Sequence, residues 1–242
     1  MKTKHFIVLG FIALWCCKRT VKEPERQIGN GTPETVQSRY VQDNMLISNE
    51  LPEITIKVHE TFEYIGNFDF EIVANSDEYE KDIQGKPIAS GERFVFAVNE
   101  DSVIEKLFIV QFEGFLPSVD FTYNYNFDKA ETIGKNKYRQ NTWYYDSKKL
   151  AEENPANEGA LTRSFLKKKG YMVEDEYMMS RFVGLASPDR KYEIIIYYLE
   201  MLRKTTGHSL NAWENKLSAN QKKTIDSALV SRSRKSFSIE KG

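Results

Sequence analysis

Cysteine is nearly absent from this 242-residue chain, and its two cysteines are adjacent, Cys16 and Cys17. Adjacent cysteines rarely form a strain-free disulfide, because the preferred separation of the two Cα atoms is about 5.5 Å. We therefore expect no structural disulfide. Histidine is also scarce: His5 lies in an apolar leader, and only His59 and His208 remain. The body of the chain cannot assemble a Cys/His metal site or a Cys/His nucleophile pair.

Motifs for nucleotide, phosphate and calcium binding are missing as well. The chain has no G-x-x-x-x-G-K-[ST] loop, no G-x-G-x-x-G and no calcium loop of the EF-hand type. It also lacks the G-x-S-x-G motif of many serine hydrolases. The formal net charge of -1 gives no bias toward nucleic acid or an anionic membrane surface. The sequence therefore predicts no cofactor, no metal and no nucleic-acid partner, and it favours a protein that is not an enzyme.

Long apolar runs are limited to one short segment at the N-terminus. Lys2 and Lys4 precede an apolar run over residues 6–15, which ends at the cysteine pair. A membrane-spanning helix needs roughly twenty apolar residues, about twice this length. A charged start, a short apolar core and a processing point are typical of an export signal. We therefore expect residues 1–17 to direct export and not to form part of the fold.

The end of this signal resembles the lipobox of bacterial lipoproteins, in which a small residue precedes a cysteine that is lipidated and becomes the mature N-terminus. Trp15 is larger than the residue usually found beside that cysteine, so both Cys17 and Cys16 are candidates for lipidation. The resemblance implies an exported lipoprotein, attached to a membrane of the cell envelope at its periplasmic or surface face. The alternative is a secretory signal with incidental cysteines.

Residues 18–53 have no sustained apolar periodicity and are rich in charged, amide and turn-forming residues. Such a segment buries too little apolar surface to offset its conformational entropy, so we expect a flexible tether. The short apolar patch at Met45, Leu46 and Ile47 is the exception, and it could dock as a first strand or helical turn. Residues 54–242 have the size of a single domain.

The first part of this domain is predicted to be rich in strands. Runs dense in Val, Ile, Phe and Tyr, punctuated by turn residues, lie there at 54–58, 68–74, 92–99, 103–115 and 119–127, and two more strands are predicted later in the chain, at 177–185 and 191–199. Apolar and polar residues alternate strictly over 119–127, which predicts one buried and one exposed face. The short turn at residues 99–102 predicts that 92–99 and 103–115 pair as antiparallel strands. With 119–127 they would form a three-stranded meander.

Three helices are predicted from capping residues and apolar stripes. Asp146 or Ser147 begins a short helix that ends before Pro155. Asn157 caps a second helix that runs to residue 169, and Ser218 begins a C-terminal helix with a capping box. The predicted fold class is α+β, with a mainly antiparallel sheet of about 6–8 strands, helices packed on one face and a C-terminal helix.

Charged or amide side chains interrupt several apolar strands, namely at Arg93, Gln111, Glu113, Arg181 and Glu193. If these residues point to the same side of the sheet, they form a polar groove in which burial shifts their pKa values. The alternative is a solvated face or structural ion pairs. Gln111 and Glu113 share a face because they are two residues apart. Their alignment with Arg181 or Glu193 depends on the strand order, which the sequence leaves open.

A second group consists of aromatic residues, with Tyr123, Tyr125, Trp143 and Tyr145 as its main members. If exposed, these rings would suit a carbohydrate, a peptide or a small apolar ligand, because tyrosine joins a rigid apolar ring to a polar hydroxyl. If buried, they belong to the core.

Three hypotheses for the function follow. The first is a lipid-anchored binding or interaction module of the bacterial cell envelope, whose ligand is an unidentified protein, peptide or carbohydrate. The second is an envelope hydrolase that uses Glu113 and Glu193 as a carboxylate pair, which requires two close carboxyl groups. The third is a structural subunit of an envelope assembly.

Overall fold

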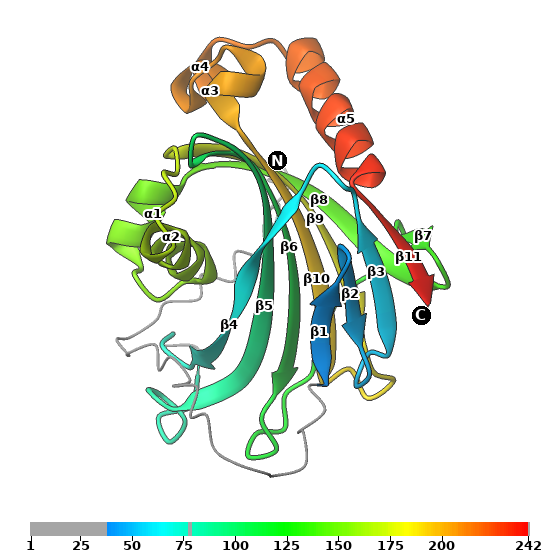
Figure 1. The fold of residues 1–242 in the computed structure, drawn as a ribbon. Helices are drawn as coiled ribbons and strands as arrows, with labels where there is room; N and C mark the ends of the chain where they lie inside the picture. Colours follow the sequence, from blue (N-terminus) through cyan, green and yellow to red (C-terminus); the bar gives the residue numbers. More distant parts are fainter. Residues whose placement is uncertain (1–37, 77–78, 242) are drawn as a thin grey trace, which may run out of the picture.

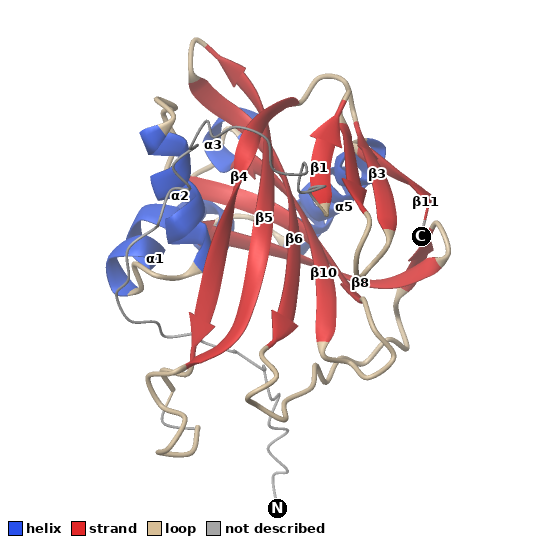
Figure 2. Ribbon diagram, turned by 60° about the horizontal axis from the view of Figure 1, so that its bottom comes forward, coloured by secondary structure: helices blue, strands red, loops and turns tan. Residues whose placement is uncertain are grey.

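Two antiparallel β-sheets and five helices make up the part of the chain that the computed structural model describes, residues 38–76 and 79–241 (Figures 1 and 2). In spatial order, the larger sheet contains β4 (Glu63–Val73), β5 (Pro87–Glu100), β6 (Val103–Phe115), β10 (Tyr192–Met201), β9 (Glu176–Leu185), β8 (Asn136–Asp146) and β7 (Glu131–Ile133). The smaller sheet contains β1 (Arg39–Gln42), β2 (Met45–Ser48), β3 (Ile54–Val58) and β11 (Phe237–Lys241). The predicted α+β class is confirmed.

Most predicted strands are present with nearly the expected bounds. The strands predicted at 54–58 and 103–115 correspond to β3 and β6 without any change of bounds. The hairpin of β5 and β6 is also present, and its turn residues Asp101 and Ser102 have φ values of 49° and 65°. Short polar residues adopt this left-handed conformation more readily than most others, which explains why a polar pair joins two apolar strands.

The predicted tether 18–53 extends too far, because its last part forms two strands. β2 pairs with β3, and β1 pairs with β2. Leu46 is 0% exposed and packs in the core between the sheets, so the apolar patch docks as a strand. Short strands carry little apolar periodicity of their own, so the sequence left the docking of this patch open, and pairing with β3 supplies its burial. Residues 1–37, including Cys16 and Cys17, lie outside the described residues.

The prediction of a strand at 119–127 is wrong, although its alternation is real. Val119 and Tyr123 are buried while Thr122 and Asn124 are exposed, but the segment forms no ladder. Both edges of β6 are already paired, with β5 and with β10, so the chain that follows β6 has no free edge beside it. The three-stranded meander consists of β4, β5 and β6 instead.

The helices begin where the capping residues predict. Asp146 accepts hydrogen bonds from the first turn of α1 (Ser147–Glu153), and Asn157 accepts one from Ala160 N, 2.8 Å away, in α2 (Glu158–Lys168). Two short helices follow β10, α3 (Leu202–Thr206) and α4 (Leu210–Asn215). The capping box of Ser218 and Gln221 begins α5 (Ala219–Lys235).

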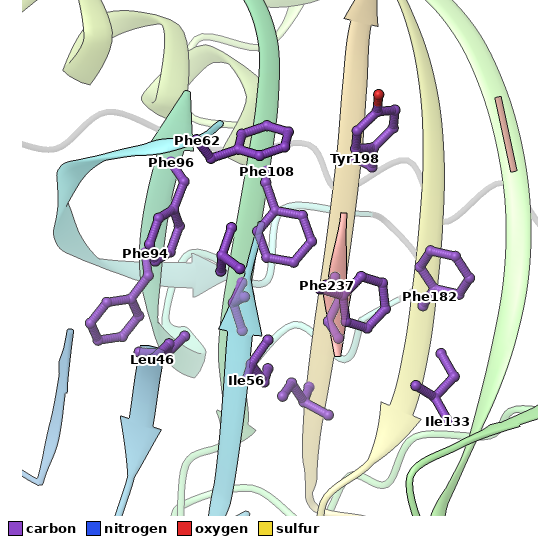
Figure 3. Packing of buried hydrophobic residues seen from close by; sticks show 14 of the residues in the cluster. Leu46, Ile56, Phe62, Phe94, Phe96, Phe108, Ile133, Phe182, Tyr198 and Phe237 are labelled. Carbon is purple, nitrogen blue, oxygen red and sulfur yellow. The ribbon is translucent and has the colours of Figure 1, made fainter. Parts of the chain in front are cut away.

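The two faces of the larger sheet bury different sets of side chains. On one face, Phe residues from β5, β6 and β9 pack against the smaller sheet and α5. Figure 3 shows Phe94, Phe96, Phe108 and Phe182 together with Leu46, Ile56 and Phe237 of the smaller sheet. On the other face, α2 contributes Leu166 to a second apolar cluster. α1 and α2 lie together beside the larger sheet, away from the smaller sheet (Figure 1). The candidate site lies on the face that α2 covers.

Candidate functional site

Strand register brings the polar residues of four strands to one face of the larger sheet. Glu113 on β6 lies directly opposite Glu193 on β10, and Gln111 lies directly opposite Arg93 on β5. Residues directly opposite each other in an antiparallel pair share a face, with Cβ atoms about 4.5–5.5 Å apart. Arg181 on β9 lies opposite Tyr197 of β10 on the same face. We call Arg93, Gln111, Glu113, Glu158, Arg181 and Glu193 the polar cluster.

Arg93 is buried, and each nitrogen of its guanidinium has a partner. Its Nε and Nη2 donate to Oε1 of Gln111, and its Nη1 donates to the carbonyl oxygen of Glu158 and to Oγ1 of Thr162, at 2.8 and 2.7 Å. Nη2 also lies 3.3 Å from Oε2 of Glu158. Arg93 therefore joins β5 and β6 to the first turn of α2, which is the role of a structural ion pair.

Glu113 is buried, and both of its carboxyl oxygens have partners. Oε1 accepts a hydrogen bond of 2.6 Å from the Tyr123 hydroxyl, and Oε2 accepts one of 2.6 Å from Nε2 of Gln111. Burial, together with the negative charge of Glu158, raises the pKa of Glu113 to about 7, even though both hydrogen bonds act in the opposite direction.

Glu193 is 2% exposed, and its Oε2 atom has no hydrogen-bond partner among residues 38–76 and 79–241. Burial and the neighbouring Glu113 raise the pKa of Glu193 to about 9, against the opposing effects of Tyr125 and Arg181. Two carboxylates directly opposite each other repel, so the pair retains at least one proton at neutral pH. Glu193 is then an uncharged acid that can donate a hydrogen bond.

Arg181 differs from Arg93 in having few partners. Its Nε atom is buried without a hydrogen-bond partner, and in the part of the chain that the structure describes no acid lies within ion-pair distance of it. The guanidinium carbon lies 5.3 Å from the ring centroid of Trp143 and 6.0 Å from that of Tyr197. Arginine remains charged in proteins, and Glu158 and Glu193, whose charges favour its charged form, lie beyond ion-pair distance, while two aromatic rings lie near the guanidinium.

The aromatic residues singled out in the sequence lie around the same cluster, but they form no continuous exposed surface. The rings of Tyr123 and Tyr125 stack at 5.9 Å, with an angle of 7° between their planes. Tyr145 stacks on Tyr177 at 5.7 Å, and only Trp143 is exposed, at 38%. Three of the four therefore belong partly or wholly to the interior.

One side chain positions the two tyrosines. Arg190 donates from Nε to the carbonyl oxygen of Tyr123, at 2.7 Å, and from Nη2 to that of Tyr125, at 3.2 Å. A backbone hydrogen bond of 2.8 Å from Tyr123 N to the carbonyl oxygen of Arg190 completes the attachment. These bonds attach the extended segment 119–127 beside the polar cluster, although the segment pairs with no strand.

Sequence reasoning missed two contributors, Glu158 and Thr162 of α2. Both approach Arg93 from the helix, and the only signal for Glu158 was its place directly after the capping residue Asn157. An acid at that position is also expected from the helix dipole alone, so the pattern does not reveal a partner on a distant strand. The predicted set was otherwise brought together, because Arg93, Gln111, Glu113, Arg181 and Glu193 all lie on the α2-covered face.

The polar cluster combines an uncharged acid with an arginine whose Nε has no hydrogen-bond partner, and aromatic rings lie beside it, which suits binding of a polar group beside an apolar surface. No set of three or more Asp, Glu, His or Cys residues within 38–76 and 79–241 is arranged to ligate a metal ion. Within the same ranges, none of the helices has the length and apolar character needed to cross a membrane.

Comparisons of the chain with protein-family models, with curated proteins and with solved structures found no match.

Proposed function

We propose that this protein is a lipid-anchored binding module of the bacterial cell envelope, with its ligand site at the polar cluster. The observation that carries the binding part is the pair of buried polar atoms without partners, Nε of Arg181 and Oε2 of Glu193. A buried polar atom without a hydrogen bond costs about 1–3 kcal/mol, and binding a ligand there would recover part of that cost.

The anchor is supported by the sequence alone. The cysteine pair directly follows the apolar run of the leader, where bacterial lipoproteins carry the lipidated cysteine. The domain would then be exported and attached to the membrane through Cys17 or Cys16, at the periplasmic or the surface face. At least two acyl chains would be needed, because one chain gives only marginal membrane binding.

A binding role is better supported than hydrolysis by the carboxyl pair. Hydrolysis with two carboxyl groups requires both to reach the substrate. The two oxygens of Glu113 are already hydrogen-bonded, to Tyr123 and to Gln111. Of the two acids, Glu193 is the one with a buried oxygen that has no hydrogen-bond partner among residues 38–76 and 79–241.

Two experiments test the two parts separately. Cells that express the full chain are labelled with a palmitate analogue, and label is expected on the wild type and on one of the two variants Cys16→Ser and Cys17→Ser. An unlabelled, soluble mature wild-type protein would refute the anchor.

For the binding part, the detergent-solubilised full chain is applied to glycan and peptide arrays. We expect binding that Arg181→Gln abolishes and that Arg203→Gln retains, since Arg203 is exposed and pairs with Glu176 at the surface. Binding that Arg181→Gln leaves unchanged, or no binding on either array, would count against this site.

A further inference from the structure

We infer that Arg181 and Glu193 bind the carboxylate group of an organic acid, whose apolar or flat body packs against Trp143. This inference rests on the proposed function and specifies the chemical class of the ligand. It follows from the kind of hydrogen-bonding groups that the cluster leaves without partners, and from the balance of charge around them.

Both atoms without partners can act as donors. Nε of Arg181 carries a hydrogen and can only donate. Glu193 is an acid held in a buried position opposite another carboxyl group, and in its protonated form it donates through its hydroxyl. Two donors on one face are complementary to a group with two acceptor oxygens, and a carboxylate is the simplest such group.

The charges around the pair favour an anion. Arg93 is compensated by Glu158 at 3.3 Å, whereas Arg181 has no acid within ion-pair distance in the residues that the structure describes. The titratable groups whose charges or hydrogen bonds act on Glu113 and Glu193 are Glu158, Arg181, Tyr123, Tyr125 and Tyr197. Below about pH 7 both Glu113 and Glu193 keep their protons, so Arg181 carries the charge that no nearby acid balances, and a ligand carboxylate would neutralise it.

Trp143 is an exposed aromatic residue beside the polar cluster. Its ring is 38% exposed and already lies against the guanidinium of Arg181, 5.3 Å from ring centroid to guanidinium carbon. A ligand that pairs with Arg181 therefore has an apolar ring within reach for its own body. Flat rings and the apolar faces of sugars both pack well on indole.

The test uses two pairs of probes that differ in a carboxylate: benzoate against benzamide, and glucuronate against glucose. Each is titrated into the detergent-solubilised full chain, and the NMR signal of the Trp143 indole N–H reports binding. Trp213 is an internal control, because it stacks on Tyr144 away from the polar cluster. The Trp143 signal is identified with Trp143→Phe.

We expect at least one acid to bind tenfold or more tightly than its neutral partner, and Arg181→Gln to abolish this preference while Arg203→Gln does not. Binding of that acid should weaken severalfold from pH 6 to pH 8, because Glu113 loses its proton near pH 7 and then repels the anion. Glu113→Gln should remove that pH dependence. Benzoate binding alone indicates an aromatic acid, and glucuronate binding alone indicates an acidic sugar.

Equal affinity for an acid and its neutral partner would overturn the inference but leave the proposed binding function intact. If none of the four probes shifts the Trp143 signal, the inference is also overturned, and the glycan and peptide arrays then decide independently whether the cluster binds another class of ligand. A carboxylate preference that persists in a folded Arg181→Gln variant would likewise refute the assignment to this arginine.

Discussion

Replacing Glu193 with glutamine should reduce the loss of stability that the wild-type protein shows as the pH rises. The pKa of Glu193 is raised to about 9 and that of Glu113 to about 7, mainly by burial. The folded protein therefore keeps two protons that the unfolded chain releases above its ordinary glutamate pKa of about 4.3. Stability from a raised carboxyl pKa is fully present below the unfolded pKa and is lost as the pH rises through the folded values.

The size of the effect follows from the number of protons. For each proton that only the folded state holds, the free energy of unfolding falls by about 1.4 kcal/mol per pH unit. Between about pH 5 and pH 7 the two acids together give a fall of about 2.7 kcal/mol per pH unit at most. Glu193→Gln leaves only Glu113 and should halve this slope. In a protein of this size, 1 kcal/mol corresponds to about 2–4 °C in Tm, so the difference is readily measured.

Thermal unfolding of the wild type and Glu193→Gln, followed by circular dichroism at several pH values, checks this prediction. Glu71→Gln is the matched control, because Glu71 is an exposed strand glutamate on β4. All other titrating groups are shared by the wild type and the two variants. Their contributions cancel when the pH dependence of stability is compared between these proteins. A wild-type slope no steeper than that of Glu193→Gln, in two folded proteins, would show that Glu193 is ionised in the folded state and would refute the reasoning.

Two further predictions concern stability. Leu46→Ala should cost about 2–5 kcal/mol in chemical denaturation, because Leu46 is 0% exposed between the sheets; a loss below about 1 kcal/mol would mean that β2 is not docked in solution. Phe121→Ala should cost about 2–3 kcal/mol, less than a fully buried phenylalanine, because its ring is partly buried against Phe115, whereas Thr122→Ala should cost well under 1 kcal/mol. Equal small losses in the second pair would show that the extended segment is detached from the protein.

Local signals predicted most of the elements correctly. Helix caps such as Asn157 and Ser218 act within three or four residues, so their consequences can be read without the rest of the fold. The alternation at 119–127 was likewise a correct indication of burial. The strand assigned to it was wrong because pairing depends on a free neighbouring edge, and β10 occupies the edge of β6. The strand β8 was missed for a different reason, since its polar and aromatic residues have no clear alternation.

The candidate site divides in the same way between sequence and tertiary structure. The sequence by itself determined which residues interrupt the apolar strands, and that Gln111 and Glu113 share a face, because side chains alternate along a strand. Only the tertiary structure decided that Glu193 lies opposite Glu113, because strand order and register arise from contacts between segments some eighty residues apart. Their raised pKa values follow from that burial and proximity, which no local pattern contains.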